Sequence, residues 1–138
     1  MGNRLQEQIA ITDYLVPLHF GATNIGDAAG TAVAYPSDTA EYIMPWDGSV
    51  VGVSAASNAD YTGGVLTFNP TVNGTANTDL AAVLADTVQR DTGVVDSDIV
   101  NFTAGQRLGV KWTKSGTVAP TTTDVSLVLW VLVKGVSL

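Results

Sequence analysis

The stretch Val125-Ser126-Leu127-Val128-Leu129-Trp130-Val131-Leu132-Val133 decides the fold class, because it is apolar on both of the faces that a β-strand presents. Successive side chains of a strand point to opposite sides of its sheet. One side therefore carries five aliphatic residues, namely Val125, Leu127, Leu129, Val131 and Val133. The other side carries Val128, Trp130 and Leu132. A small antiparallel domain usually wets one face of its sheet, so we expect a β-sandwich whose outer face is covered by another subunit.

Other segments also read as short strands. In residues 107–113, Leu108, Val110 and Trp112 alternate with outward positions, which is the pattern of a half-buried strand. We expect further strands at residues 14–20, 31–35, 41–46, 49–57, 65–72 and 99–102. The dipeptides Asp47-Gly48 and Asn73-Gly74 predict tight hairpins. Short strands at this spacing indicate an all-β domain.

Pro17 limits where the first of these strands can lie. Proline has no amide to donate to the ladder, so a strand containing it is confined to an edge or interrupted by a bulge. We therefore expect residues 14–20 to form an edge strand or to carry a bulge.

Residues 80–88 are the exception to the strand pattern. Leu80, Val83, Leu84 and Val88 recur at helical spacing, and Asp79 suits the N-terminal cap. The alternation of side-chain character at residues 87–90 keeps a strand as the alternative. We prefer one short helix here.

The length of 138 residues suits a single domain. Residues 1–13 are mostly polar and lack a strong helical or strand spacing of apolar residues. Leu5, Ile9 and Ile11 are their apolar anchors. We expect an extended N-terminal arm over residues 1–13 and one β-sandwich domain over residues 14–138. The three anchors have too few neighbours to build a core. They gain most by docking on an adjoining subunit, at roughly 1.5–3 kcal/mol for each fully buried side chain.

Charge and composition exclude several classes of partner. The net charge is −7 and the six Lys and Arg residues are scattered, whereas a nucleic-acid surface needs clustered cations. No segment reaches the roughly 18–20 apolar residues of a membrane span, and no signal-peptide core is present, so we expect synthesis in the cytosol. The absence of cysteine excludes disulfides and thiolate metal sites.

The residues that could carry chemistry favour structural explanations. His19, the only histidine, lies between two apolar residues of a strand and reads as a packed or edge histidine. Asp91, Asp96 and Asp98 lack the spacing of a calcium loop and read as a solvated acidic turn. We therefore expect no catalytic, metal or cofactor-binding residue, no cofactor and no enzymatic activity.

Three segments carry a resemblance to a known class of proteins. They read Thr-Val-Asn-Gly-Thr at residues 71–75, Phe-Thr-Ala-Gly-Gln-Arg-Leu-Gly-Val-Lys-Trp at residues 102–112, and Thr-Asp-Val-Ser-Leu-Val-Leu at residues 123–129. In this order they resemble the strands of small jelly-roll or TNF-like modules of tailed bacteriophage particles. A V-N-G-T hairpin and an F-x-A-G-D-x-L-x-V turn and strand recur there, and Gln106 stands where the acid is common. The resemblance covers about residues 42–133.

The resemblance implies a jelly-roll-like antiparallel β-sandwich in a capsid decoration (head cement) protein, a head-fibre knob or a tail-fibre tip. A short chain without a shaft favours decoration, which implies a homotrimer bound to the major capsid protein on the capsid exterior and assembled in the host cytoplasm. Val128, Trp130 and Leu132 are then the expected subunit interface, and the arm residues Leu5, Ile9 and Ile11 the expected partner contacts. The alternative is a receptor- or carbohydrate-binding fibre tip that uses Tyr61 or Trp46.

Overall fold

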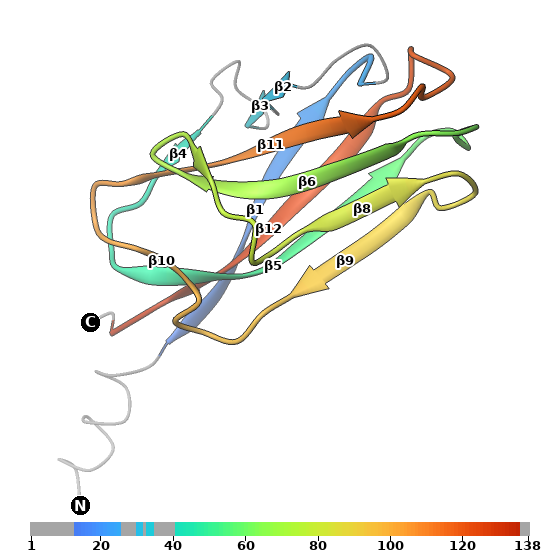
Figure 1. The fold of residues 1–138 in the computed structure, drawn as a ribbon. Coiled ribbons are helices and arrows are strands. Elements are labelled where there is room, and N and C mark those ends of the chain that lie inside the picture. The colour runs from blue at the N-terminus through green and yellow to red at the C-terminus, as the bar shows by residue number, and fades with distance from the viewer. Residues whose placement is uncertain (1–12, 26–29, 32, 35–40, 136–138) are drawn as a thin grey trace, which may run out of the picture.

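The computed structural model describes residues 13–25, 30–31, 33–34 and 41–135, and within them it contains strands and turns but no helix. The strands are β1 (Tyr14–Ala22), β2 (Gly30–Thr31), β3 (Val33–Ala34), β4 (Tyr42–Ile43), β5 (Gly48–Ser57), β6 (Val65–Val72), β7 (Thr75–Ala76), β8 (Ala82–Ala85), β9 (Arg90–Val94), β10 (Val100–Phe102), β11 (Arg107–Ser115) and β12 (Val125–Val133). They form two antiparallel sheets packed face to face, with β11 and β6 in front and β1 and β12 behind in Figure 1. The predicted all-β sandwich is confirmed.

The order of the strands is that of a jelly roll. Sheet A runs β10-β5-β12-β1-β3, with β9 also paired to β5. Sheet B runs β2-β11-β6-β7, with β4 paired to β11 and β8 to β6. The chain changes sheet at every step except β6 to β7, β7 to β8 and β9 to β10. This interleaving is the double Greek key of jelly rolls, as the sequence resemblance implied.

The core lies between the sheets and is built by alternation along each long strand. The five aliphatic residues predicted to share the inner face of β12 are each at most 4% exposed. On β11, Leu108 and Val110 are fully buried and Trp112 packs half-buried against the core. The predicted period of two is therefore confirmed in both strands.

The edge position expected for Pro17 is also confirmed. On one side, β1 pairs with β12 over its whole length, with Pro17 opposite Trp130. On the other side, it pairs with β3 only at Phe20 and Gly21. The missing amide of Pro17 therefore falls where β1 has a neighbour on one side only in the described residues.

The helix expected at residues 80–88 is wrong. Residues 82–85 form β8 instead, which pairs with β6 and sets Leu84 opposite Leu66. Leu80, Ala82 and Leu84 are all buried, so every second side chain enters the core. Leu80 and Leu84 also fit helical spacing. The segment forms a strand because its backbone pairs with β6. Asp79 caps no helix.

Of the two predicted hairpins, one is confirmed. Asn73 and Gly74 adopt positive φ angles of 50° and 81° and join β6 to β7. The hairpin at Asp47-Gly48 is wrong, because β4 belongs to sheet B and β5 to sheet A. Gly48 allows the backbones of β5 and β12 to approach closely, since a Cβ on Gly48 would overlap the Leu132 carbonyl oxygen.

The two ends of the described chain lie side by side. The Asp13 carboxylate accepts a hydrogen bond from the Gly135 amide at 3.0 Å, so the start of β1 is tied to the end of β12. The expected arm, including Leu5, Ile9 and Ile11, lies outside the described residues except for Asp13.

Candidate functional surface

The outward positions of sheet A form the candidate functional surface, which we call the outer face of sheet A. The strand registers place side chains from β1, β12, β5 and β9 on it. These outward positions include Leu15, Pro17, His19, Val128, Trp130, Leu132, Gly52, Ser54, Thr92 and Val94, with Arg90 at the end of β9. These positions alternate with the core residues of the same strands, so they point away from sheet B.

One row of this face crosses four strands. Pro17 lies opposite Trp130, Trp130 opposite Gly52, and Gly52 opposite Val94. Trp130 is 37% exposed and Val94 is 75% exposed. In the next row Leu15, 57% exposed, lies opposite the half-buried Leu132. Large apolar groups of different strands therefore meet on one side of the sheet.

Charge is depleted on this face. Among the outward residues of β1, β12, β5 and β9, only Arg90 at the end of β9 is charged. The Asp91 side chain points the other way, and its carboxylate accepts the Val83 amide at 2.7 Å. Buried centres of protein interfaces show this combination of aromatic residues and few charges.

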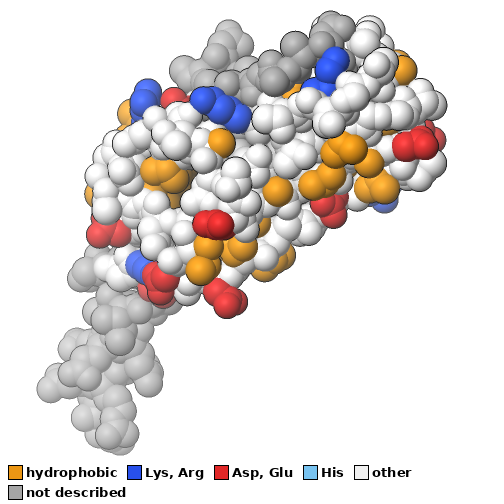
Figure 2. All heavy atoms as spheres, in the orientation of Figure 1, with side chains coloured by type: hydrophobic (Ala, Val, Ile, Leu, Met, Phe, Trp, Pro, Cys, Tyr) orange, Lys and Arg blue, Asp and Glu red, His pale blue; other side chains and the backbone are white. Residues whose placement is uncertain are grey.

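The opposite surface differs in character. The outward positions of sheet B carry the hydroxyls of Thr67 and Thr113 and the cations of Arg107 and Lys111. Apolar outward residues there lie at both ends, with Val65 opposite Ala85 at one end and the 71% exposed Ile43 opposite Arg107 at the other. Figure 2, which views this side, shows Lys and Arg mainly toward the top and hydrophobic side chains in separate patches among backbone and other side chains. This face differs from the outer face of sheet A in carrying cations and hydroxyls along β11 and β6 between its apolar residues.

Two features make the free edge of β1 a poor site for adding another strand. Pro17 offers no amide, and the Tyr42 hydroxyl donates to the His19 carbonyl at 3.1 Å. The Tyr42 ring packs edge-on against Phe20, with the ring centroids 5.4 Å apart. Protected edges of this kind oppose sheet continuation, so the faces are the better place for association.

The structure brings Val128, Trp130 and Leu132 together as the sequence predicted. The sequence analysis missed their neighbours Leu15, Pro17 and Val94. Leu15 carried a usable signal, because it alternates with Val16 and Leu18 in a predicted strand. Val94 did not, because it lay in the segment interpreted as an acidic turn.

The three aspartates interpreted as one solvated turn have different environments. Asp91 lies in β9 and binds the Val83 amide, so this part of the interpretation is wrong. Asp98 pairs with Lys134, and Asp96 lies exposed in the loop that follows β9. Within residues 13–25 and 41–135, no three potential ligand side chains gather into a metal site.

The residues considered for catalysis and for glycan binding are also placed. His19 is exposed on the outer face of sheet A, opposite Val128. Trp46 is 51% exposed and remains available to a ligand. Tyr61 is 1% exposed, so the expectation that it serves as a loop aromatic in a binding tip is wrong. The described chain also contains no helix of the length and apolarity that a bilayer crossing requires.

No protein-family model matches the chain. A search of curated proteins likewise gave no significant match.

Proposed function

We propose that this chain is a structural virion protein that assembles as a homotrimer through the outer face of sheet A and reinforces a phage capsid from outside. The observation that carries the proposal is the row from Pro17 through Trp130 to Val94, which spans four strands of the face. Monomers seldom expose contiguous apolar groups of this kind. The jelly-roll order of the strands supports the class of particle protein that the sequence resembles.

The partners follow from the two parts of the chain. The apolar face serves contacts between copies, and the arm serves contacts beyond the sandwich, through Leu5, Ile9 and Ile11. The major capsid protein is the proposed shell partner, on the exterior of a particle assembled in the host cytoplasm. The proposal involves no nucleic acid, membrane, cofactor or catalytic step.

The first test is the oligomeric state. Light scattering coupled to size exclusion should give about three times the chain mass of 14.3 kDa for the wild type. Trp130→Lys should give monomers, because it places a charge at the centre of the face. Thr113→Lys adds the same charge to the outer face of sheet B and should leave the trimer intact. A monomeric wild type, or equal effects of the two variants, would contradict the proposal.

The second test concerns the shell. Capsids that were assembled without this chain should co-sediment with the wild type and with Thr113→Lys. Absence of wild-type binding would argue against decoration while leaving self-association in place.

A receptor- or carbohydrate-binding tip remains the second candidate, because Trp46 is half exposed next to the exposed Ile43 strand. A glycan array separates the two. Binding that is abolished by Trp46→Ala, together with no binding to capsids, would favour the tip.

A further inference from the structure

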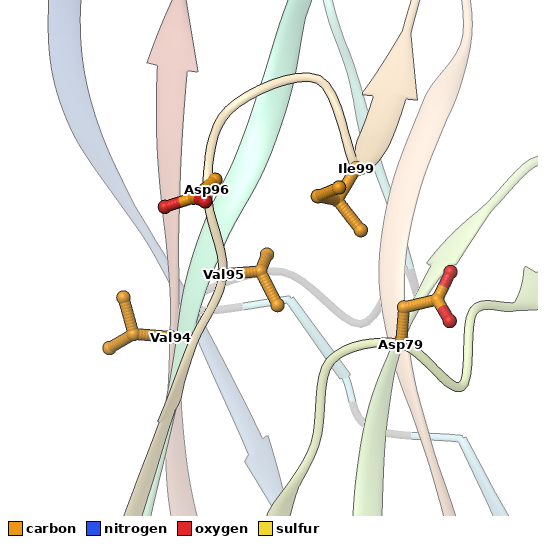
Figure 3. Close-up of a pocket in the computed structure, with 5 residues that line it drawn as sticks. All are labelled: Asp79, Val94, Val95, Asp96 and Ile99. Carbon is orange, nitrogen blue, oxygen red and sulfur yellow. The ribbon is translucent and has the colours of Figure 1, made fainter.

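A hollow of about 530 Å³ lies at the edge of sheet A, where β9 ends and the chain turns toward β10. We call it the β9 groove. It is lined by Asp79, Val94, Val95, Asp96 and Ile99. Figure 3 shows Val95 and Ile99 turned toward the hollow, whereas Val94 points to the other side of its strand and the carboxylates of Asp96 and Asp79 point away from each other. Val94 and Ile99 are 75% and 48% exposed, so the groove offers apolar surface flanked by two carboxylates.

Neither carboxylate has a cation beside it in the described part of the chain. The ion pairs found there join Arg107 to Glu41 and Lys134 to Asp98. An occupant that complements the groove therefore carries a cation directly beside an aliphatic side chain.

We propose that the β9 groove receives the N-terminal arm of a neighbouring copy, with Leu5 against Val95 and Ile99 and Arg4 beside Asp96. Arg4 is the only Lys or Arg in residues 1–12, and Leu5 follows it directly. The inference rests on the proposed self-association, because the arm comes from a second subunit.

The position of the groove supports this occupant. Val94 lines the groove and also ends the row on the outer face of sheet A. Leu15, two residues after Asp13, the last residue of the arm, lies on the same face. A neighbour that packs on this face therefore brings the root of its arm close to the groove. An extended chain covers about 3.3–3.6 Å per residue, so Leu5 can stand up to roughly 27 Å from Asp13.

The absence of cysteine allows a direct test by disulfide trapping. The trapping variant carries Gln6→Cys beside the proposed anchor and Ser97→Cys on the exposed loop next to Asp96. Mild oxidation should produce covalent dimers and larger species on a non-reducing gel. The control variant carries Gln6→Cys with Ser115→Cys, which is exposed at the end of β11 in sheet B, and should remain uncrosslinked.

Charge reversal then tests the role assigned to Arg4. Arg4→Glu in the trapping variant should slow crosslinking about tenfold, because a carboxylate then faces Asp96 in place of a cation. Adding Asp96→Lys should restore most of the rate. Unchanged crosslinking in Arg4→Glu would overturn the assignment of Arg4.

The remaining outcomes separate this inference from the proposed function. A trimer whose arm crosslinks no faster to Ser97→Cys than to Ser115→Cys overturns the groove inference alone. A disulfide that forms only within single chains of the trapping variant places the arm on its own subunit. That result overturns the proposed contact between subunits. A wild type that stays monomeric overturns both.

Discussion

Trp130 on β12 lies opposite Gly52 on β5, and a Cβ atom on Gly52 would stand 3.4 Å from both Cβ and Cδ1 of Trp130. The indole therefore lies over the one residue of its row that has no side chain. This explains how a side chain on the outer face is 37% exposed and still packed from below. The ring lies between Pro17 and Val94 in the row, so it joins the two ends of the apolar surface.

The first prediction concerns the stability of Trp130→Ala. Complete burial of an aromatic side chain would make this change cost about 3–5 kcal/mol within a single chain. Because Trp130 is only partly covered, we expect a loss of about 1–2 kcal/mol in the monomer and a larger loss in association. Urea unfolding at several protein concentrations separates the two, because the midpoint of an oligomer depends on concentration. The midpoint should shift with concentration in the wild type and not in Trp130→Ala.

The second prediction compares two glycines of neighbouring strands. A Cβ on Gly93 would overlap the carbonyl oxygen of Ala81, where β8 and β9 come together. Gly93→Ala should therefore destabilise the fold by about 2–3 kcal/mol, because the backbone must move. A Cβ on Gly52 meets only ordinary contacts. Gly52→Ala should change stability by less than about 1 kcal/mol. Equal losses in thermal unfolding would contradict this account of Gly93.

Much of the fold could be predicted from the spacing of apolar residues alone, because some strands carry an unambiguous pattern. Residues 65–72 and 125–133 match β6 and β12 to the residue. Residues 80–88 were misread because Leu80 and Leu84 satisfy both the helical spacing and the strand spacing. Only the pairing of β8 with β6 resolves such a case, and no window of sequence contains that information.

The same limit applies to the candidate surface. Val128, Trp130 and Leu132 belong to one strand, so alternation was enough to group them. Pro17 and Val94 join them through registers between strands that are far apart in sequence. A one-residue change of register would turn either side chain to the other face, so the complete row required the structure.

The third prediction concerns Asp91 and metal ions. The Asp91 carboxylate accepts the Val83 amide between β8 and β9, so Asp91→Ala leaves that donor without its partner. We expect a loss of about 1–2 kcal/mol, whereas the exposed Asp96→Ala should stay within about 0.5 kcal/mol. Chelation with EDTA should leave the Tm of the wild type unchanged. A fall of several degrees that calcium reverses would reveal a bound ion coupled to folding.

The fourth prediction concerns Tyr61, whose ring is buried in the core. Its hydroxyl has no hydrogen-bond partner of acceptable geometry within the described structure. Burial raises the pKa of the Tyr61 phenol above its ordinary value of 10.0, and the nearby Ser57 side chain partly opposes this shift. The Ser57 hydroxyl itself donates to the Ala59 carbonyl at 2.8 Å.

The raised pKa gives a definite sign to the pH dependence. Above about pH 10 the unfolded chain releases the phenol proton while the folded chain retains it, so stability falls as pH rises toward the folded pKa. Tyr61→Phe should weaken this alkaline loss. At pH 7 it should leave stability unchanged or raise it by up to about 1 kcal/mol, because an unpaired buried hydroxyl is removed. Urea unfolding at pH 7 and pH 10.5 measures both effects, and a loss above 1 kcal/mol at pH 7 would indicate a hydrogen bond to the hydroxyl.

The last prediction separates the arm from the sandwich. The described core is closed by β1 and β12, and Asp13 is tied to Gly135, so removal of residues 1–12 should leave a folded body. Circular dichroism of the truncated and full-length chains should therefore agree. Leu5, Ile9 and Ile11 are lost together, and each 1.4 kcal/mol of binding energy corresponds to a factor of ten, so capsid attachment should weaken by orders of magnitude. The full-length Thr113→Lys variant serves as the control for a surface change that should not affect binding. Equal co-sedimentation of truncated and full-length chains would refute the role of the arm, and unfolding of the truncated chain would show that residues 1–12 belong to the sandwich itself.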